Sequence, residues 1–225
     1  MPREQSNHNE TTMKLTKYEH ACVFLENDNG DKVIIDPGMF TNLPDDLSQV
    51  VAIVITHEHP DHFFPEKLDK ILAQNPNAQI FGSTEVVTKL NQATEPEKSK
   101  IYNISSFSLE FYGDEHELIR QNLPIIKNLG VCINNLVAYP GDSYAQFPRP
   151  VRYLLAPSSG PWLRAMEACE FIASAKSDVI IPTHDALLSD TGIDVYDFHF
   201  ADTAKQTGKT YQRLKPSDSI ILSAT

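Results

Sequence analysis

The chain has 225 residues, 41% of them hydrophobic and 22% charged, and its 30 acidic and 19 basic residues give a formal net charge of −11. This is a soluble globular composition, and the length suits one ordinary α/β domain. The acidic balance argues against a nucleic-acid-binding surface, which needs basic side chains for phosphate. It leaves room for a small-molecule substrate, even an anionic one if a metal ion supplies positive charge.

The cysteines and the amino-terminal residues indicate the cellular compartment in which the protein is expected. Cys22, Cys132 and Cys169 are far apart and read as small core residues of a protein in a reducing environment. The sequence has no 18-residue apolar run and no hydrophobic signal region, so we expect a cytoplasmic protein that does not act on membranes. Residues 1–12, with His8, are predicted to be a disordered tail, and residues 13–225 a single domain; a homo-oligomer stays open.

The first half of the chain alternates between predicted strands and helices. Two strands flank the turn at residues 27–30, and the second ends at the Asp36-Pro37-Gly38 turn. The unbroken apolar run at residues 50–55, followed by Thr56, indicates a central strand covered on both faces. We expect a helix over 65–75, a strand over 79–83 and a short helix whose N-cap is Ser83.

The second half is richer in strands. Phe107, Leu109 and Phe111 alternate with polar residues, as in a strand with one buried face. The other elements expected are strands over 136–143, 151–159 and 179–185, the longest helix over 161–176 with Pro161 in its first turn, a helix from about Val195 and a strand near 220–222. Because strands and helices intermix throughout, we predict an α/β protein with two sheets or one large mixed sheet.

The predicted central strand runs into a dense group of ligand-type residues, ITHEHPDHFF. His57 and His59 are two apart, so in extended backbone both imidazoles point to one side. Pro60 favours extended backbone before it and suits the start of a short helix that carries Asp61 and His62. A solvent-exposed polar loop is the alternative reading, but the density of the motif directly behind a buried strand favours a metal site. Imidazole and carboxylate suit zinc, and also manganese or iron.

Three more candidates follow apolar strands in the same way: His116, Asp142 and His184. Each alone reads as a loop residue, but active groups of α/β proteins gather beyond the carboxyl ends of strands. As a set we therefore predict that they join the first motif as metal ligands. His20 and His199 are interpreted as structural or exposed.

In this set of residues the chain resembles the metallo-β-lactamase fold superfamily. Its signature, His-x-His-x-Asp-His followed by a His, an Asp and a His, is matched by His57, His59, Asp61, His62, His116, Asp142 and His184. Asp36 matches the superfamily's strand-end aspartate, which supports the site. The motifs at 141–143, 157–162 and 182–185 are most similar to the L-ascorbate 6-phosphate lactonase-like branch. Relatives in that branch often have a histidine where this chain has Tyr139, a departure that would alter the substrate pocket or the groups behind the ligands.

The resemblance implies a four-layer αβ/βα sandwich of two mixed β-sheets and a site for two divalent metal ions. His57, His59 and His116 would bind one ion, and Asp61, His62 and His184 the other, with Asp142 as the bridge. Zinc is the expected metal, with manganese or iron as alternatives. A hydroxide between the ions, oriented by the catalytic Asp61, would attack a small ester, lactone or phosphoester.

The substrate contacts are less defined. Arg149, Arg152 and Arg164 flank the 157–162 turn and could bind phosphate or carboxylate, with surface solvation as the alternative. Trp162 either lines the pocket or packs into the core, and we interpret Ser143 and Ser159 as turn residues. Two other functions remain open: an iron-dependent oxidoreductase or oxygenase on the same fold, and a non-catalytic metal-binding sensor.

Overall fold

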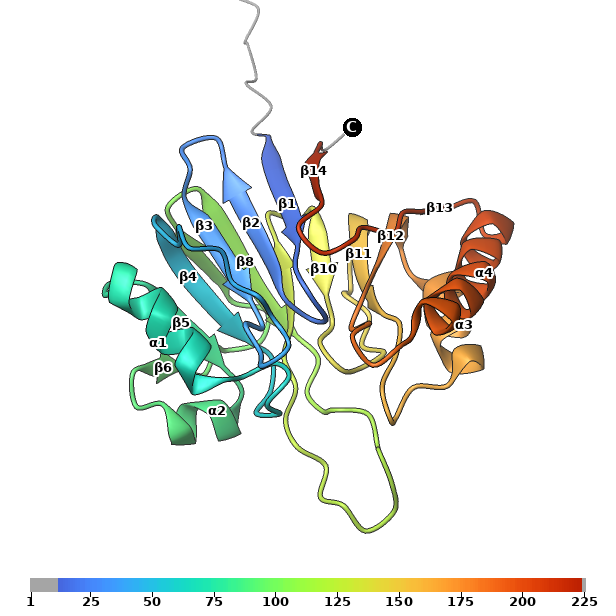
Figure 1. Ribbon diagram of the computed structural model, residues 1–225, viewed down its shortest axis with the longest axis horizontal. Coiled ribbons are helices and arrows are strands. Elements are labelled where there is room, and N and C mark those ends of the chain that lie inside the picture. The colour runs from blue at the N-terminus through green and yellow to red at the C-terminus, as the bar shows by residue number, and fades with distance from the viewer. Residues whose placement is uncertain (1–11, 224–225) are drawn as a thin grey trace, which may run out of the picture.

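The computed structural model describes residues 12–223, which form two seven-stranded mixed β-sheets with helices outside them (Figure 1). The first sheet comprises β1 (Met13–Lys17), β2 (Val23–Asn27), β3 (Lys32–Ile35), β4 (Val50–Ile55), β5 (Gln79–Gly82), β6 (Ala93–Thr94) and β14 (Ser219–Leu222). The second comprises β7 (Ile101–Ile104), β8 (Phe107–Tyr112), β9 (Gly130–Ile133), β10 (Val137–Tyr139), β11 (Val151–Pro157), β12 (Ser177–Thr183) and β13 (Thr210–Tyr211). The helices are α1 (Pro65–Gln74), α2 (Thr84–Lys89), α3 (Ala165–Ser174) and α4 (Asp190–Gln206).

The two sheets have the same internal arrangement. In the order β14-β1-β2-β3-β4-β5-β6, the first four strands pair antiparallel and the pairs from β3 to β6 are parallel. In the order β7-β8-β9-β10-β11-β12-β13, the same change occurs at β10. The αβ/βα sandwich of two mixed sheets is therefore confirmed, and each sheet presents the carboxyl ends of several parallel strands at one edge.

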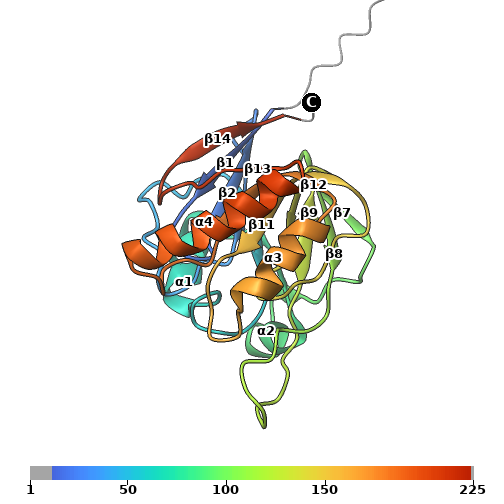
Figure 2. The same cartoon turned by 90° about the vertical axis from the view of Figure 1, so that its right-hand side faces the viewer.

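Three apolar cores hold the layers together. The first lies between the sheets and includes Leu25, Val54 and Phe111. The other two lie between each sheet and its helices: α1 and α2 cover one outer face, and α3 and α4 cover the other (Figures 1 and 2). Helix α1 turns Leu68 and Ile71, three residues apart, toward its sheet. β4 is buried over nearly its whole length, as predicted for a central strand. Residues that follow β4 can therefore become accessible to solvent only beyond the edge of the sheet.

Two of the expected helices differ from the structure, and the N-cap expected for a third is confirmed. The helix expected from Pro161 begins only at Ala165, because residues 161–164 form a turn that aims Trp162 at the neighbouring edge of the sheet. The longest helix is instead α4, which starts five residues before the predicted Val195; the Ser189 hydroxyl caps it by accepting from the Gly192 amide at 3.2 Å. Ser83 does occupy the N-cap position of α2, but its side chain makes no capping hydrogen bond.

The short helix expected at Pro60 is a single turn. The amides of His62 and Phe63 both donate to the carbonyl of His59, at 3.0 and 2.8 Å, and the helix proper begins at Pro65. This tight turn folds the chain back over the end of β4, so that Asp61 and His62 return toward His57.

Other predictions concern the whole chain. The tail predicted over residues 1–12, including His8, falls outside the described residues except for Thr12, whose amide donates to Asp28 at 3.1 Å. Cys22 and Cys132 are buried, Cys169 is half-buried, and all three are free thiols. None of the helices within residues 12–223 has the length and apolar character to cross a bilayer.

Candidate metal centre

The structure brings all seven predicted ligands together at one edge of the sandwich. Each arrives just after a strand of one of the two sheets: β4 leads to His57, His59, Asp61 and His62, and β8, β10 and β12 lead to His116, Asp142 and His184. Because these strands belong to both sheets, the site spans the junction between the two halves. It lies just beyond the ends of the strands, where the chain leaves the apolar interior and polar side chains follow.

One group consists of three histidines. The Nε2 atom of His57 lies 3.1 Å from Nδ1 of His59, and the ring of His116 is centred 4.8 Å from each of the other two rings. One ligand atom from each histidine lies within 4.8 Å of those of the others. Three imidazole nitrogens at this spacing can face a single cation.

The second group has Asp142 at its centre. The Nε2 atom of His62 lies 3.2 Å from Asp142 Oδ1, and Nε2 of His184 lies 3.0 Å from Oδ2 of the same carboxylate. Asp61 completes the group, with its Oδ2 atom 3.5 Å from His184 Nε2. Asp142 Oδ2 also lies 3.4 Å from Nε2 of His116, so this carboxylate reaches both groups. Its position is the one expected of a bridging ligand.

Several ligand atoms of the cluster are buried without a hydrogen-bond partner. Within residues 12–223 these include Nε2 of His62, Nε2 of His116, both ring nitrogens of His184 and Oδ1 of Asp142. Burying unpaired polar atoms is costly, and native proteins satisfy nearly all of them. Neutral imidazole and carboxylate are the donors that zinc and similar divalent ions take, so the residues fit the metal that the resemblance implies.

Hydrogen bonds behind the histidines orient them. The Asp36 carboxylate accepts from the Thr56 amide at 2.7 Å and from the Thr56 hydroxyl at 2.8 Å, and its Oδ2 lies 2.7 Å from Nδ1 of His62. Because the Thr56 hydroxyl donates to Asp36, it accepts from Nδ1 of His57, 3.0 Å away. Nδ1 of His116 donates to the carbonyl of Glu117 at 2.5 Å. When neutral, His57, His62 and His116 therefore carry their ring proton on Nδ1. Each presents an unprotonated Nε2 to the candidate metal centre.

Comparison with known proteins agrees with this geometry. The model of the β-lactamase superfamily domain matches residues 14–184, which include all seven clustered residues. The chain belongs to the metallo-β-lactamase superfamily. The protein Rv0786c of Mycobacterium tuberculosis is 24% identical over 218 residues, which cover 93% of this chain and 99% of that protein.

Solved structures share the fold at low sequence identity. A putative metal-dependent hydrolase from Parabacteroides distasonis superposes with a TM-score of 0.73 at 18% identity, covering 92% of this chain and 94% of that one. CmlA, a diiron β-hydroxylase from Streptomyces venezuelae, gives a TM-score of 0.65 at 14% identity; the match covers 95% of this chain but 54% of CmlA. The fold is thus shared by proteins with different activities.

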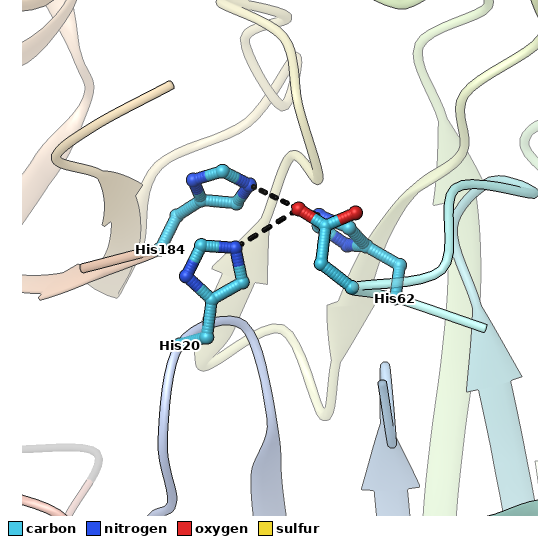
Figure 3. A group of neighbouring side chains, drawn as sticks. His20, His62 and His184 are labelled. Carbon is cyan, nitrogen blue, oxygen red and sulfur yellow. Dashed lines mark hydrogen bonds and ion pairs between the residues drawn. The ribbon is translucent and has the colours of Figure 1, made fainter. Parts of the chain in front are cut away.

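His20 also belongs to this metallo-β-lactamase site, although its sequence context indicated only a structural or exposed residue. Its Nδ1 accepts a hydrogen bond from the Ala186 amide at 3.1 Å, so its proton lies on Nε2 and is donated to Asp61 Oδ2 at 3.0 Å. The His20 carbonyl accepts from the His184 amide at 2.8 Å. The rings of His20, His62 and His184 consequently gather around a shared carboxylate (Figure 3). The role of His20 becomes visible only in three dimensions, where the β1–β2 turn contacts the end of β12.

Trp162 both lines the site and packs into the core. Its side chain is buried, and its Nε1 donates to Asp142 Oδ2 at 2.9 Å. Its ring meets those of His116 and His184 edge-on, with centroids 5.9 and 6.3 Å away. The indole therefore fixes one oxygen of the central carboxylate and shields that side of the site from water.

The arginines proposed for substrate do not reach the centre. The guanidinium of Arg149 is held by Glu110 and by Asn135, at 2.9 Å from the latter. Arg152 stands near the start of β11, whereas the site lies beyond the ends of the strands. Arg164 pairs with Glu167 on the surface, at 2.9 Å. None of the three arginines therefore supports the substrate-binding alternative, and Arg149 and Arg164 make ion pairs with acidic side chains instead.

Two further residues are placed as follows. His199 is exposed on α4, away from the cluster, in line with the reading given to it. Tyr139, which stands where the lactonase-like relatives often have histidine, is buried, and its hydroxyl donates to the Ala21 carbonyl at 3.3 Å, next to His20 in the chain. This tyrosine supports the floor of the site, and the narrower resemblance to the lactonase-like branch stays a prediction.

The charges of the cluster balance within it. Burial lowers the pKa of His57 well below its ordinary value, and burial together with His116 lowers the pKa of His59. Burial also opposes the charged form of His184, but Asp142 outweighs it and raises the pKa of His184 to about 9. Burial works against ionised Asp142 too, yet His184 and His62 hold its pKa well below the usual range. In the metal-free protein, the positive charge of protonated histidines such as His184 thus offsets the negative charge of Asp142.

This balance predicts opposite pH trends for metal affinity and for the stability of the metal-free protein. Metal must displace the His184 proton, so we expect its affinity to fall by up to about tenfold per pH unit below about 9. The His184 pKa is raised from 6.5, so its pairing with Asp142 stabilises the metal-free fold fully below 6.5, and this contribution is lost as the pH rises through about 9. Competitive zinc titration and urea unfolding between pH 6 and 10 would measure both, and parallel trends would contradict the prediction.

Proposed function

We propose that this metal-dependent hydrolase of the metallo-β-lactamase superfamily holds two divalent metal ions, zinc above all, and hydrolyses a small ester, lactone or phosphoester. The observation that carries the proposal is the set of buried ligand atoms that make no hydrogen bond, contributed by both sheets. The fold brings five imidazoles and two carboxylates into contact, five of the seven side chains buried, and bound cations would offset the cost of burying them.

Each residue has a defined task in this proposal. His57, His59 and His116 would hold one ion, Asp61, His62 and His184 the other, and Asp142 would contact both. Such ions, when bound, supply the Lewis acidity that makes water a nucleophile at neutral pH and stabilises developing negative charge.

Asp61 is the candidate for proton handling. Its side chain is 22% exposed, against 4% for Asp142 and 0% for Asp36, so an entering water can reach it. The nearby His184 ring and the hydrogen bond from His20 outweigh the effect of burial and hold the pKa of Asp61 well below its usual range. The carboxylate is therefore ionised and fixed, ready to accept a hydrogen bond from the attacking water and orient it.

Removal of His20 tests how Asp61 is held. We expect His20→Ala to lower kcat by about 10–100-fold, because the carboxylate loses the donor that fixes it. His20→Gln, whose amide can donate from a similar position, should recover part of the loss. Steady-state kinetics and metal content would be measured for both variants; equal activity of His20→Ala and the wild type would contradict this role.

The main experiment combines metal content with a substrate panel. The purified protein would be loaded separately with zinc, manganese and iron, and assayed on lactones, thioesters, phosphodiesters and β-lactams, with His59→Ala as the inactive reference. The proposal predicts about two ions per chain and turnover of at least one hydrolysable substrate by the wild type alone. A protein that binds no metal after loading would contradict it.

The same experiment separates the alternatives. The fold likeness to CmlA does not itself favour oxygen chemistry, since fold and activity vary independently. An iron-dependent oxidoreductase or oxygenase would be active only with iron and would show optical bands that change on reduction. A metal-loaded protein that turns over no member of the panel would instead favour a sensor.

A further inference from the structure

A small cavity opens directly beside the three-histidine group. Its volume is about 130 Å³, and two of its walls are His59 and His116. Apart from Glu117 the remaining wall is apolar, formed by Leu118, Ile119, Leu123, Pro124, Ile125 and Ile126. Sites for whole drug-sized ligands measure roughly 300–1,000 Å³, so this cavity has room for one substituent of a substrate.

The apolar wall belongs to the long loop between β8 and β9, residues 113–129, which extends beyond the sheets at the bottom of Figure 1. Its base is tied to the metal centre: the His116 amide donates to the Ile126 carbonyl at 3.0 Å, and the Glu117 amide donates to the Asp142 carbonyl at 2.9 Å. The wall is therefore held in a fixed position relative to two predicted ligands.

Exposed apolar side chains also stand on three segments that adjoin the metal centre. Leu118 and Ile125 of the loop are 50% and 53% exposed, and Met39 and Leu187 are 46% and 53% exposed. Met39 is bonded through its amide to Pro60, and Leu187 comes three residues after His184. Large exposed hydrophobic side chains that collect around one site mark a binding surface.

The cavity offers no charge complement to a phosphate. No lysine or arginine lines it, and the one charged residue that does, Glu117, is acidic and accepts a hydrogen bond from the Tyr144 amide at 3.2 Å. Beside His184 in the sequence, Asp185 binds the cations Lys17 and Arg213, at 2.9 and 2.7 Å, so neither is free for a phosphate. Placing an anion against this apolar and acidic wall would be costly.

We infer that the protein acts on neutral carboxylic esters or lactones that carry a short hydrocarbon group, and that this group binds in the cavity beside His59 and His116. The inference rests on the proposed function and narrows its substrate class. Hydrolysis breaks the acyl carbon–oxygen bond: water supplies its oxygen to the acid and a proton to the departing alcohol. The apolar group on the acyl side then sits in the cavity while the carbonyl lies at the metal centre.

Binding of product-like carboxylates tests the subsite without relying on turnover. The zinc-loaded protein would be titrated with acetate, propionate, butyrate and hexanoate, by calorimetry and by fluorescence of Trp162, which is the only tryptophan and lies beside His116. We expect the affinity to rise by about fourfold per methylene up to butyrate and then to level off as the cavity fills. Equal affinity across the series would overturn the inference.

A pair of matched variants locates the effect. Leu118→Lys places a cation in the wall, whereas Ile101→Lys makes the same change at a residue of equal exposure on β7, 51% against 50%. We expect Leu118→Lys to abolish the chain-length preference, and Ile101→Lys to keep it with unchanged metal content. An unchanged preference in both variants would contradict the assignment.

Kinetics on p-nitrophenyl acetate, butyrate and hexanoate, with bis(p-nitrophenyl) phosphate as the anionic competitor, separates the two proposals. A two-metal protein that hydrolyses esters without chain-length preference, or prefers the phosphodiester, would overturn the subsite inference and retain the proposed function. A protein that takes up no metal would overturn both.

Discussion

Replacing Asp142 by asparagine is expected to reduce kcat by about a thousandfold or more and to lower the metal content to at most one ion per chain. The Asp142 side chain is 4% exposed, and its two oxygens lie 3.0–3.4 Å from nitrogens of His62, His116 and His184. Asparagine keeps the shape of the side chain but removes the negative charge that would offset the two proposed cations. A loss of roughly 4 kcal/mol of transition-state stabilisation corresponds to this factor.

The matched control for this change is Asp114→Asn. Asp114 makes surface ion pairs with Lys98 and Lys127, and its side chain is 52% exposed, so the same loss of charge there should leave metal content and activity near those of the wild type. Elemental analysis and kinetics on one preparation of each protein would compare the metal content and the activity of the two variants. Retention of two ions by Asp142→Asn would show that the carboxylate is not shared between them.

Replacing Gly38 by alanine should destabilise the protein by about 3 kcal/mol and abolish activity as well, although Gly38 is not a ligand. A methyl group at this position would lie 1.7 Å from the carbonyl oxygen of Asp61 and 2.6 Å from the amide nitrogen of His62. Both contacts are with backbone, so the turn after β3 and the turn that carries Asp61 must separate. The Met39–Pro60 hydrogen bond of 2.8 Å, which joins the two turns, would be lost with them.

Gly192→Ala provides the control for this prediction. Gly192 lies in the first turn of α4, and an added methyl group meets first the flexible Leu188 side chain, at 3.3 Å. For Gly192→Ala we expect the free energy of unfolding to stay unchanged or to rise by up to about 1 kcal/mol. Urea unfolding of the metal-free proteins, with metal content measured in parallel, compares the two; similar unfolding midpoints would contradict the close-contact argument.

Much of the candidate site was predictable because it uses local rules. A β-branched run that ends in His57-x-His59 fixes both the strand and the direction of the imidazoles, and His116 and His184 repeat the pattern of a polar group just beyond an apolar strand. Parallel pairing of strands in both sheets then places these ends at one edge, as the structure shows. The resemblance to the superfamily supplied the four-layer arrangement.

What the sequence did not predict depends on contacts between distant segments. His20 has no neighbouring ligand motif, and its role follows from the β1–β2 turn meeting Asp61 and Ala186. The helix expected from Pro161 failed because the bond from Trp162 to Asp142, a tertiary contact, favours a turn there. Strands β6 and β13 have two residues each, too few for a periodic pattern.

Crystals of the zinc-loaded protein, examined by anomalous scattering at the zinc edge, would show whether the seven side chains share two ions. We expect two peaks roughly 3.5–4 Å apart, one within bonding distance of His57, His59 and His116 and the other of Asp61, His62 and His184, with Asp142 touching both. The absence of any peak among these seven side chains in crystals prepared with excess zinc would contradict it.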